Sequence, residues 1–215
     1  MSEQGLFDCS PDDTHTQIMR ATYEALRKHG YSELTIQRIG DEFPKSKSLI
    51  YQHYDAKDEL LVAFLEFLLE RLEEDMPIDG EFDDAREHLR TLVDYALPDS
   101  FEPEHVDFME AIEALRGQAP HDDAYREQFA ATDDFHRSHV ADVIRAGIDQ
   151  GVFRDVDPER TADFIVATIH GARNQRATTE THEPVRAARE ELEAYLRTRV
   201  FVDDAEESDA SASEE

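Results

Sequence analysis

The segment formed by residues 46–53 places several hydrogen-bonding side chains close together. It reads Ser-Lys-Ser-Leu-Ile-Tyr-Gln-His, and so supplies hydroxyl, ammonium, amide and imidazole groups within about two helical turns. Groups of these kinds recognise base edges and phosphates when the first turns of a helix enter the major groove of DNA. The residues of this segment that could reach base edges are Ser46, Lys47, Ser48, Leu49, Gln52 and His53.

Two short helices joined by a tight turn would position this segment. The hydroxyl of Thr35 can cap the first helix and Pro44 would end it, while Ser46 can cap the second. The small size of Gly40 would let a neighbouring helix approach closely. Residues at helical spacing predict the buried face of the pair, with Ile36, Ile39, Gly40 and Phe43 on the first helix and Ile50 and Tyr54 on the second.

The rest of the chain predicts further helices and no strand. A helix before this pair is expected to stop at Gly30, and another should cover residues 57–74. More helices are expected near residues 82–97, 103–117, 121–150, 158–178 and 184–202, separated by proline and glycine. The predicted fold class is therefore all-α, with an N-terminal three-helix helix-turn-helix domain, a C-terminal helical bundle and about nine helices in total.

The N-terminal region resembles the TetR family of transcriptional regulators over residues 18–61, without a gap. The matching residues are Gly30-Tyr31, Leu34-Thr35-Ile36, Ile39-Gly40, the run at 46–54 and Lys57-Asp58-Glu59-Leu60-Leu61. The resemblance implies a homodimer on a near-palindromic operator in double-stranded DNA. It implies phosphate contacts by Thr35, Tyr51 and Lys57, and positions facing or bordering the bases for Lys47, Ser48, Leu49, Gln52 and His53.

The turn between the two short helices departs from the family pattern. Where the family usually has Ala-Gly-Val, this chain has Phe43-Pro44-Lys45, so a charged residue stands at a normally apolar position. Phe43 could supply the apolar bulk instead, which would leave Lys45 able to reach a phosphate. Leu49 stands where threonine is common, and it could contact a thymine methyl group or simply pack.

Several of these residues also have a purely structural interpretation. Tyr51 and Tyr54 could both be core aromatic residues, and His53 is open to either interpretation. Lys47 at an exposed helix start could be an ordinary solvated charge. A DNA role for Lys47 is favoured because the chain has only four lysines, all of them within residues 15–60.

The net charge of the chain argues against a nucleic-acid partner at first sight. The 51 acidic and 22 basic residues give a formal net charge of −29, which repels a DNA backbone. Residues 15–60, however, carry seven acidic and seven basic side chains, so the whole excess lies elsewhere. Such an excess with scarce lysine is typical of halophile proteins that work in concentrated salt, although an ordinary acidic protein is the alternative. In such salt we expect DNA binding to depend on base contacts and few ion pairs.

The C-terminal half is expected to form the dimer. Residues 151–158 resemble the junction between two long helices in the regulatory domains of the family, whose following helices meet their copies in a four-helix interface. A core stripe within one chain is the alternative. The candidate interface residues are Phe164, Ile165, Ile169, Val185, Leu192, Tyr195 and Leu196.

A pocket for an unknown small-molecule effector is expected among the helices after residue 57. Its walls would favour an apolar or amphipathic effector, although each wall residue could equally belong to the core. No cofactor is indicated. A metal site can be drawn through Asp133, His136, His139 and Asp142, but acidic helices bring such residues together by chance, and none is assigned. The candidate pocket residues are Phe64, Tyr95, Phe108, Met109, Ile112, Tyr125, Phe129 and Phe135.

These features predict five segments. They are an N-terminal extension at 1–11, the helix-turn-helix domain at 12–56, a connecting helix at 57–74, a ligand-binding and dimerisation domain at 75–202, and a disordered tail at 203–215 with seven acidic residues and no basic ones. No membrane span, secretory signal or second cysteine accompanies Cys9, so the cytoplasm is the expected compartment.

A ligand-responsive repressor is the function that these features favour. The alternative is a helical ligand-binding or scaffold protein with the same fold and no operator. An enzyme is not indicated, because no nucleophile elbow, phosphate-binding glycine loop or zinc-protease motif occurs in the sequence.

Overall fold

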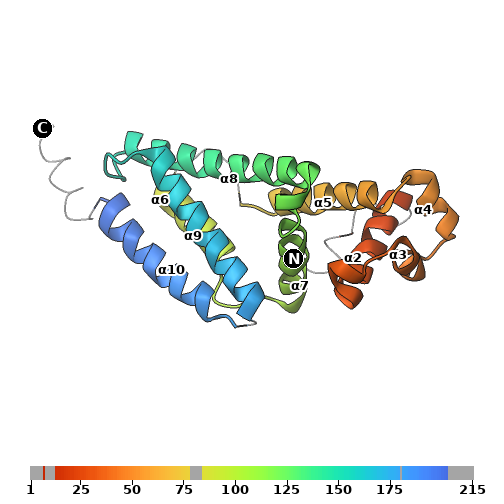
Figure 1. The fold of residues 1–215 in the computed structure, drawn as a ribbon. Coiled ribbons are helices and arrows are strands. Elements are labelled where there is room, and N and C mark those ends of the chain that lie inside the picture. The colour runs from red at the N-terminus through yellow and green to blue at the C-terminus, as the bar shows by residue number, and fades with distance from the viewer. Residues whose placement is uncertain (1–6, 8–12, 78–83, 180, 203–215) are drawn as a thin grey trace, which may run out of the picture. The chain divides into compact units, whose positions relative to one another are not determined.

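The described part of the chain contains helices and no strand, which confirms the all-α prediction. The computed structural model describes Phe7 and residues 13–77, 84–179 and 181–202. A single antiparallel bridge between Phe153 and Phe201 is the only β-type pairing in these ranges. The α-helices are α2 (Thr14–Glu33), α3 (Ile36–Glu42), α4 (Lys47–His53), α5 (Lys57–Glu74), α6 (Ala85–Ala96), α7 (Pro103–Arg116), α8 (Asp123–Asp149), α9 (Pro158–Thr179) and α10 (Glu183–Tyr195) (Figure 1). Short helices of other types cover Ala119–His121 and Leu196–Val200.

The helix ends predicted for the N-terminal region are present. The hydroxyl oxygen of Thr35 accepts a hydrogen bond from the Arg38 amide at 3.2 Å and caps α3. The Ser46 hydroxyl caps α4 in the same way by accepting from the Ser48 amide. Gly30 has φ 70° and ψ 166°, so the backbone leaves helical geometry at the predicted stop before a last turn runs to Glu33. A left-handed φ of this kind favours glycine.

The helices form two compact units. One contains Met1–Asp75 and Phe101–Thr132, and the other contains Met76–Ser100 and Asp133–Glu215. A break near residue 75 was predicted, but α7 and the start of α8 pack with the N-terminal helices, since α7 contacts both α2 and α5. The predicted 75–202 domain is therefore divided between the two units. The predicted tail at 203–215, and all of the 1–11 extension except Phe7, lie outside the described residues.

The first unit is built around one apolar core. Residues of α2, α3, α4, α5, α7 and the start of α8 all contribute to it. The predicted inward residues Ile39, Phe43, Ile50 and Tyr54 are buried there, and Ile36 packs against its edge. The pair of short helices is thus held by its apolar face, which leaves the opposite face to solvent.

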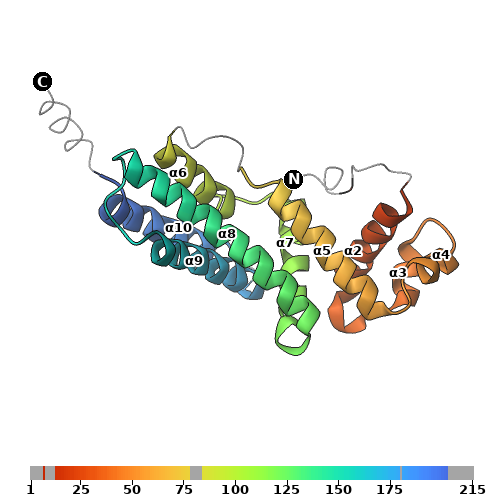
Figure 2. The same cartoon turned by 90° about the horizontal axis from the view of Figure 1, so that it is seen from above.

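The second unit is organised around the α9–α10 pair, whose helices lie side by side (Figures 1 and 2). The end of the described chain returns to the turn between α8 and α9. The Arg154 amide donates to the Val200 carbonyl at 2.7 Å, and the Val202 amide donates to the Val152 carbonyl at 3.0 Å. The rings of Phe153 and Phe201 stack beside these bonds with centroids 5.2 Å apart. No described helix is long and apolar enough to cross a membrane.

Gly147 on α8 is the residue against which Phe153 packs. A Cβ atom at this position would lie 2.1 Å from the Phe153 ring. We expect Gly147→Ala to lower the free energy of unfolding by about 1–3 kcal/mol through overpacking, and the melting temperature by roughly 3–10 °C. Gly117→Ala is the matched control, because a Cβ there meets only ordinary contacts from 3.6 Å outward. Equal melting temperatures for the two variants would contradict this account of the junction.

Candidate nucleic-acid interface

The outward face of α4 carries the polar residues that the sequence predicted for base contact. Ser46, Ser48, Gln52 and His53 are exposed, whereas Ile50 on the opposite face is fully buried. Leu49 is half-buried and packs against the edge of the core. The hydroxyl oxygens of Ser46 and Ser48 lie 2.8 Å apart in a hydrogen bond at the start of the helix.

The two tyrosines of this region have different environments. Tyr51 is 59% exposed, which excludes a core role, whereas Tyr54 is only 8% exposed and belongs to the core. Burial raises the pKa of the Tyr54 phenol. Only Tyr51 is therefore available to a partner molecule.

The unusual turn before α4 is filled as the sequence suggested. Phe43 is buried and occupies the apolar position, while Pro44 and Lys45 are exposed. The Lys45 ammonium donates a hydrogen bond to the Thr14 hydroxyl at 3.2 Å. The replacement of the usual glycine-containing turn thus leaves a cation exposed next to the cap of α4.

The other lysines around α4 contact either an aromatic ring or a carboxylate. The Lys57 ammonium lies 5.3 Å from the centre of the Tyr31 ring. Lys28 forms an ion pair with Glu42 at 2.5 Å, and this hydrogen bond raises the pKa of the Lys28 ammonium. Lys47 is half-buried and pairs with Asp41 at 2.6 Å. No helical spacing could have revealed the Asp41 pairing, because it crosses the turn between α3 and α4.

The seven candidate interface residues of the C-terminal half separate into two groups. Phe164 is 47% exposed, Tyr195 is half-buried, and their rings lie 4.5 Å apart. The other five are buried within one chain, so they cannot add contact area to a second copy. They therefore match the alternative of a core stripe within one chain. These residues are Ile165, Ile169, Val185, Leu192 and Leu196.

The exposed stripe of α9 that begins at Phe164 was missed by sequence reasoning. None of the residues in this stripe is charged, although the chain as a whole is strongly acidic. The spacing is that of one helix face. The exposed residues of this stripe are Phe164, Ala167, Gly171, Asn174, Gln175 and Thr178.

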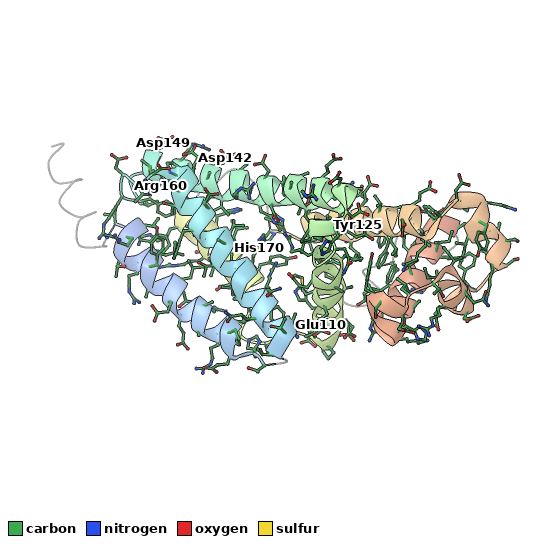
Figure 3. All side chains as sticks on the ribbon, viewed as in Figure 1. Glu110, Tyr125, Asp142, Asp149, Arg160 and His170 are labelled. Atoms are coloured by element: carbon green, nitrogen blue, oxygen red, sulfur yellow. The ribbon has the colours of Figure 1, made fainter. Side chains whose placement is uncertain are left out.

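The candidate pocket residues also fall into separate groups. Tyr95, which is half-buried, and Phe135, which is exposed, belong to the second unit. Figure 3 labels Tyr125 on α8, whose phenol pKa is raised by burial. The six residues that meet in the core of the first unit are Phe64, Phe108, Met109, Ile112, Tyr125 and Phe129.

Two of the four residues considered for a metal site, His139 and Asp133, lie next to other histidines. The Nε2 atoms of His139 and His88 lie 3.2 Å apart, and Nε2 of His170 (Figure 3) lies 3.8 Å from a carboxylate oxygen of Asp133. Burial is the main reason why the pKa values of His88 and His139 are lowered. Within the described ranges, no three His, Cys, Asp or Glu side chains are grouped so that they could hold a metal ion.

Two family models match the chain. Residues 18–64 match the model described as bacterial regulatory proteins, tetR family. Residues 85–200 match the model described as BetI-type transcriptional repressor, C-terminal. Together they cover the pair of short helices and most of the second unit.

Individual proteins are similar over most of their length. A TetR transcription regulator from Haloarcula marismortui is 37% identical, with 86% of this chain and 97% of that chain covered and a TM-score of 0.80. The HTH-type transcriptional repressor AcnR of Corynebacterium glutamicum is 22% identical over 88% of this chain and 95% of its own length. A transcriptional regulator from Saccharomonospora viridis in complex with choline is 23% identical, with 88% and 98% covered and a TM-score of 0.72.

Proposed function

This chain belongs to the TetR family of DNA-binding transcriptional regulators, and from that premise we propose that it is an effector-responsive repressor that binds a near-palindromic operator as a homodimer. The observation that carries the proposal is the outward face of α4. In a chain of net charge −29, this face presents hydroxyl, amide, imidazole and phenol groups and has no acidic residue between positions 43 and 54.

The DNA contacts in this proposal divide by role. Ser48, Gln52 and His53 read base edges, with Leu49 at the border of the same face. Backbone phosphates are held by hydroxyl and ammonium groups around the cap of α4 and the starts of α3 and α5. These phosphate contacts are Thr35, Lys45, Ser46, Tyr51 and Lys57.

The dimer interface in this proposal is the exposed stripe of α9 together with Tyr195 of α10. Phe164 and Phe135 are two of the three large apolar side chains that are exposed among the described residues, and the exposed stripe of α9 from Phe164 to Thr178 has no charged residue. A charge-poor face on an acidic chain allows two copies to meet without strong repulsion. The small residues Ala167 and Gly171 allow close approach of the two helices.

An amphipathic cation is the effector class that we propose to test first. The acidic excess outside residues 15–60 attracts cations. The complex of the Saccharomonospora viridis regulator with choline supports this class.

Genome-wide capture with the tagged protein in concentrated salt tests the proposed function. We expect enrichment of sites whose two half-sites lie about 34–36 Å apart along the helix axis, or a multiple of that spacing. Choline should release the captured DNA. Recovery of no more DNA than a mock capture recovers would favour the alternative, a binding or scaffold protein without an operator. Retention of the DNA in saturating choline would contradict the proposed effector class.

A further inference from the structure

The basic side chains near the candidate DNA-binding face differ in whether their charge is already neutralised. Lys28, Arg38 and Lys47 each form an ion pair with a carboxylate, at 2.5, 3.0 and 2.6 Å. Lys45 instead donates a hydrogen bond to the Thr14 hydroxyl, and the Lys57 ammonium lies over the Tyr31 ring. Within the described part of the chain, no carboxylate lies at ion-pair distance from either of these two lysines.

Lys47 is folded back onto the preceding helix. Its aliphatic stem lies across Gly40, where an added Cβ would come within 2.6–2.9 Å of three Lys47 carbons. Its ammonium donates to the Asp41 carboxylate at 2.6 Å and to the Gln37 carbonyl at 3.3 Å. One side chain at the start of α4 is therefore attached to α3 at three positions, Gln37, Gly40 and Asp41, and Gly40 provides the space for its stem.

We propose that Lys47 is a positioning residue that fixes α4 against α3, and that Lys45 and Lys57 provide the ammonium charge that meets DNA phosphates. This inference rests on the proposed function. If the Lys47 ammonium moved to a phosphate, Asp41, which is 60% exposed, would remain unpaired beside the same surface and would repel DNA. The Lys47–Asp41 pair is neutral as a unit and so contributes little to binding that depends on counterion release.

The location of Asp41 provides a second reason for Lys47 to stay in place. Asp41 lies in the last turn of α3, where the helix dipole disfavours a negative charge. The Lys47 ammonium compensates for this charge and lies near a main-chain carbonyl of the same helix. Among the described residues, Lys45 and Lys57 would leave no paired carboxylate behind when they meet a phosphate, so their positive charge is available to DNA.

The salt dependence of DNA binding separates positioning from phosphate contact. Each phosphate neutralised by a lysine contributes about 0.9 to the slope of log K against log salt concentration, and a dimer carries each lysine twice. We expect Lys45→Gln and Lys57→Gln each to reduce this slope by about two. The double variant Asp41→Asn/Lys47→Gln should keep the wild-type slope, with an affinity roughly 3- to 10-fold lower because α4 is less firmly held.

The measurements use fluorescence anisotropy of the full-length protein with two probes, a duplex selected from a randomised library and an unrelated duplex. Loss of positioning should reduce the preference for the selected duplex, whereas a smaller folded fraction would lower both affinities equally. Gly40→Ala, which displaces the Lys47 stem, should reproduce the effect of the double variant. Lys28→Gln is the matched control, since it removes a paired lysine away from α4 and should change neither slope nor preference.

Two outcomes would overturn this assignment. A slope for Asp41→Asn/Lys47→Gln that falls as far as that of Lys45→Gln would make Lys47 a phosphate contact. A double variant with wild-type slope, affinity and preference would make Lys47 an ordinary surface charge. Failure of the wild-type protein to select any duplex would be a different result, because it would remove the proposed function and this inference together.

Discussion

Replacing Tyr51 with glutamate should abolish specific DNA binding and leave the protein folded. Tyr51 is 59% exposed on the face of α4 that is proposed to meet DNA, so the substitution removes little packing. It places a carboxylate against the DNA backbone and removes a phenol hydroxyl that can donate to a phosphate. Juxtaposed like charges cost several kcal/mol, so we expect the affinity for the selected duplex to fall at least about 100-fold.

Fluorescence anisotropy measures this loss, and circular dichroism with thermal melting measures the fold. His29→Glu is the matched control, because it introduces the same charge at an exposed position at the end of α2. We expect the control to bind within a fewfold of the wild type. If Tyr51→Glu bound as tightly as His29→Glu, the outward face of α4 would not be the DNA-binding surface.

Phe164→Asp is expected to convert the dimer into monomers. The side chain is 47% exposed in one chain, and a two-fold interface would bury it twice. Truncation of a buried aromatic anchor commonly costs 2 kcal/mol or more, and the introduced carboxylates would face each other near the symmetry axis. The dissociation constant of the dimer should therefore rise by about 100-fold or more. Operator affinity should fall with it, because a monomer engages only one half-site.

Analytical ultracentrifugation over a range of protein concentrations measures this effect. Phe135→Asp makes the same exchange at a side chain that is 37% exposed on α8, outside the proposed interface. We expect Phe135→Asp to remain dimeric. A dimer of unchanged stability in Phe164→Asp would assign the uncharged stripe of α9 to some other partner.

The local structure of the helix-turn-helix was predictable because each of its signals is local. A hydroxyl caps a helix within three residues of itself, so Thr35 and Ser46 could be assigned from sequence and their cap bonds are present. Gly30 marked the point where the backbone leaves helical geometry. The inward and outward faces of α4 followed from helical spacing, since Ile50 is buried and Gln52 is exposed.

The predictions for the C-terminal half were weaker because apolar spacing does not say which neighbour covers a residue. Ile165 and Phe164 are adjacent apolar residues on α9, yet Ile165 is buried within the chain and Phe164 is largely exposed. The same limitation applies to the aromatic residues proposed for a pocket, such as Phe64 and Phe108, which meet in a packed core. Periodicity identifies a buried stripe, but the three-dimensional packing decides whether the chain itself covers it.

Long-range ion pairs were beyond the reach of sequence patterns for a related reason. Lys47 and Asp41 are six positions apart but on different helices, and Arg27 of α2 pairs with Asp107 of α7, eighty residues away. An acidic chain offers many carboxylates to each cation. Only the folded arrangement selects one of them.

The packing of α7 on α2 limits how this protein can be taken apart. The Arg27–Asp107 ion pair and the side chains of Phe108 and Ile112 make α7 part of the same core as α2. A fragment that ended after α5 would lack α7, and the apolar surface of α2 and α5 that α7 covers would be exposed to solvent. The segment from α2 to α5 is therefore not an autonomous module, and grafting it onto another regulatory domain would require transplanting α7 as well, which begins some thirty residues further along the chain.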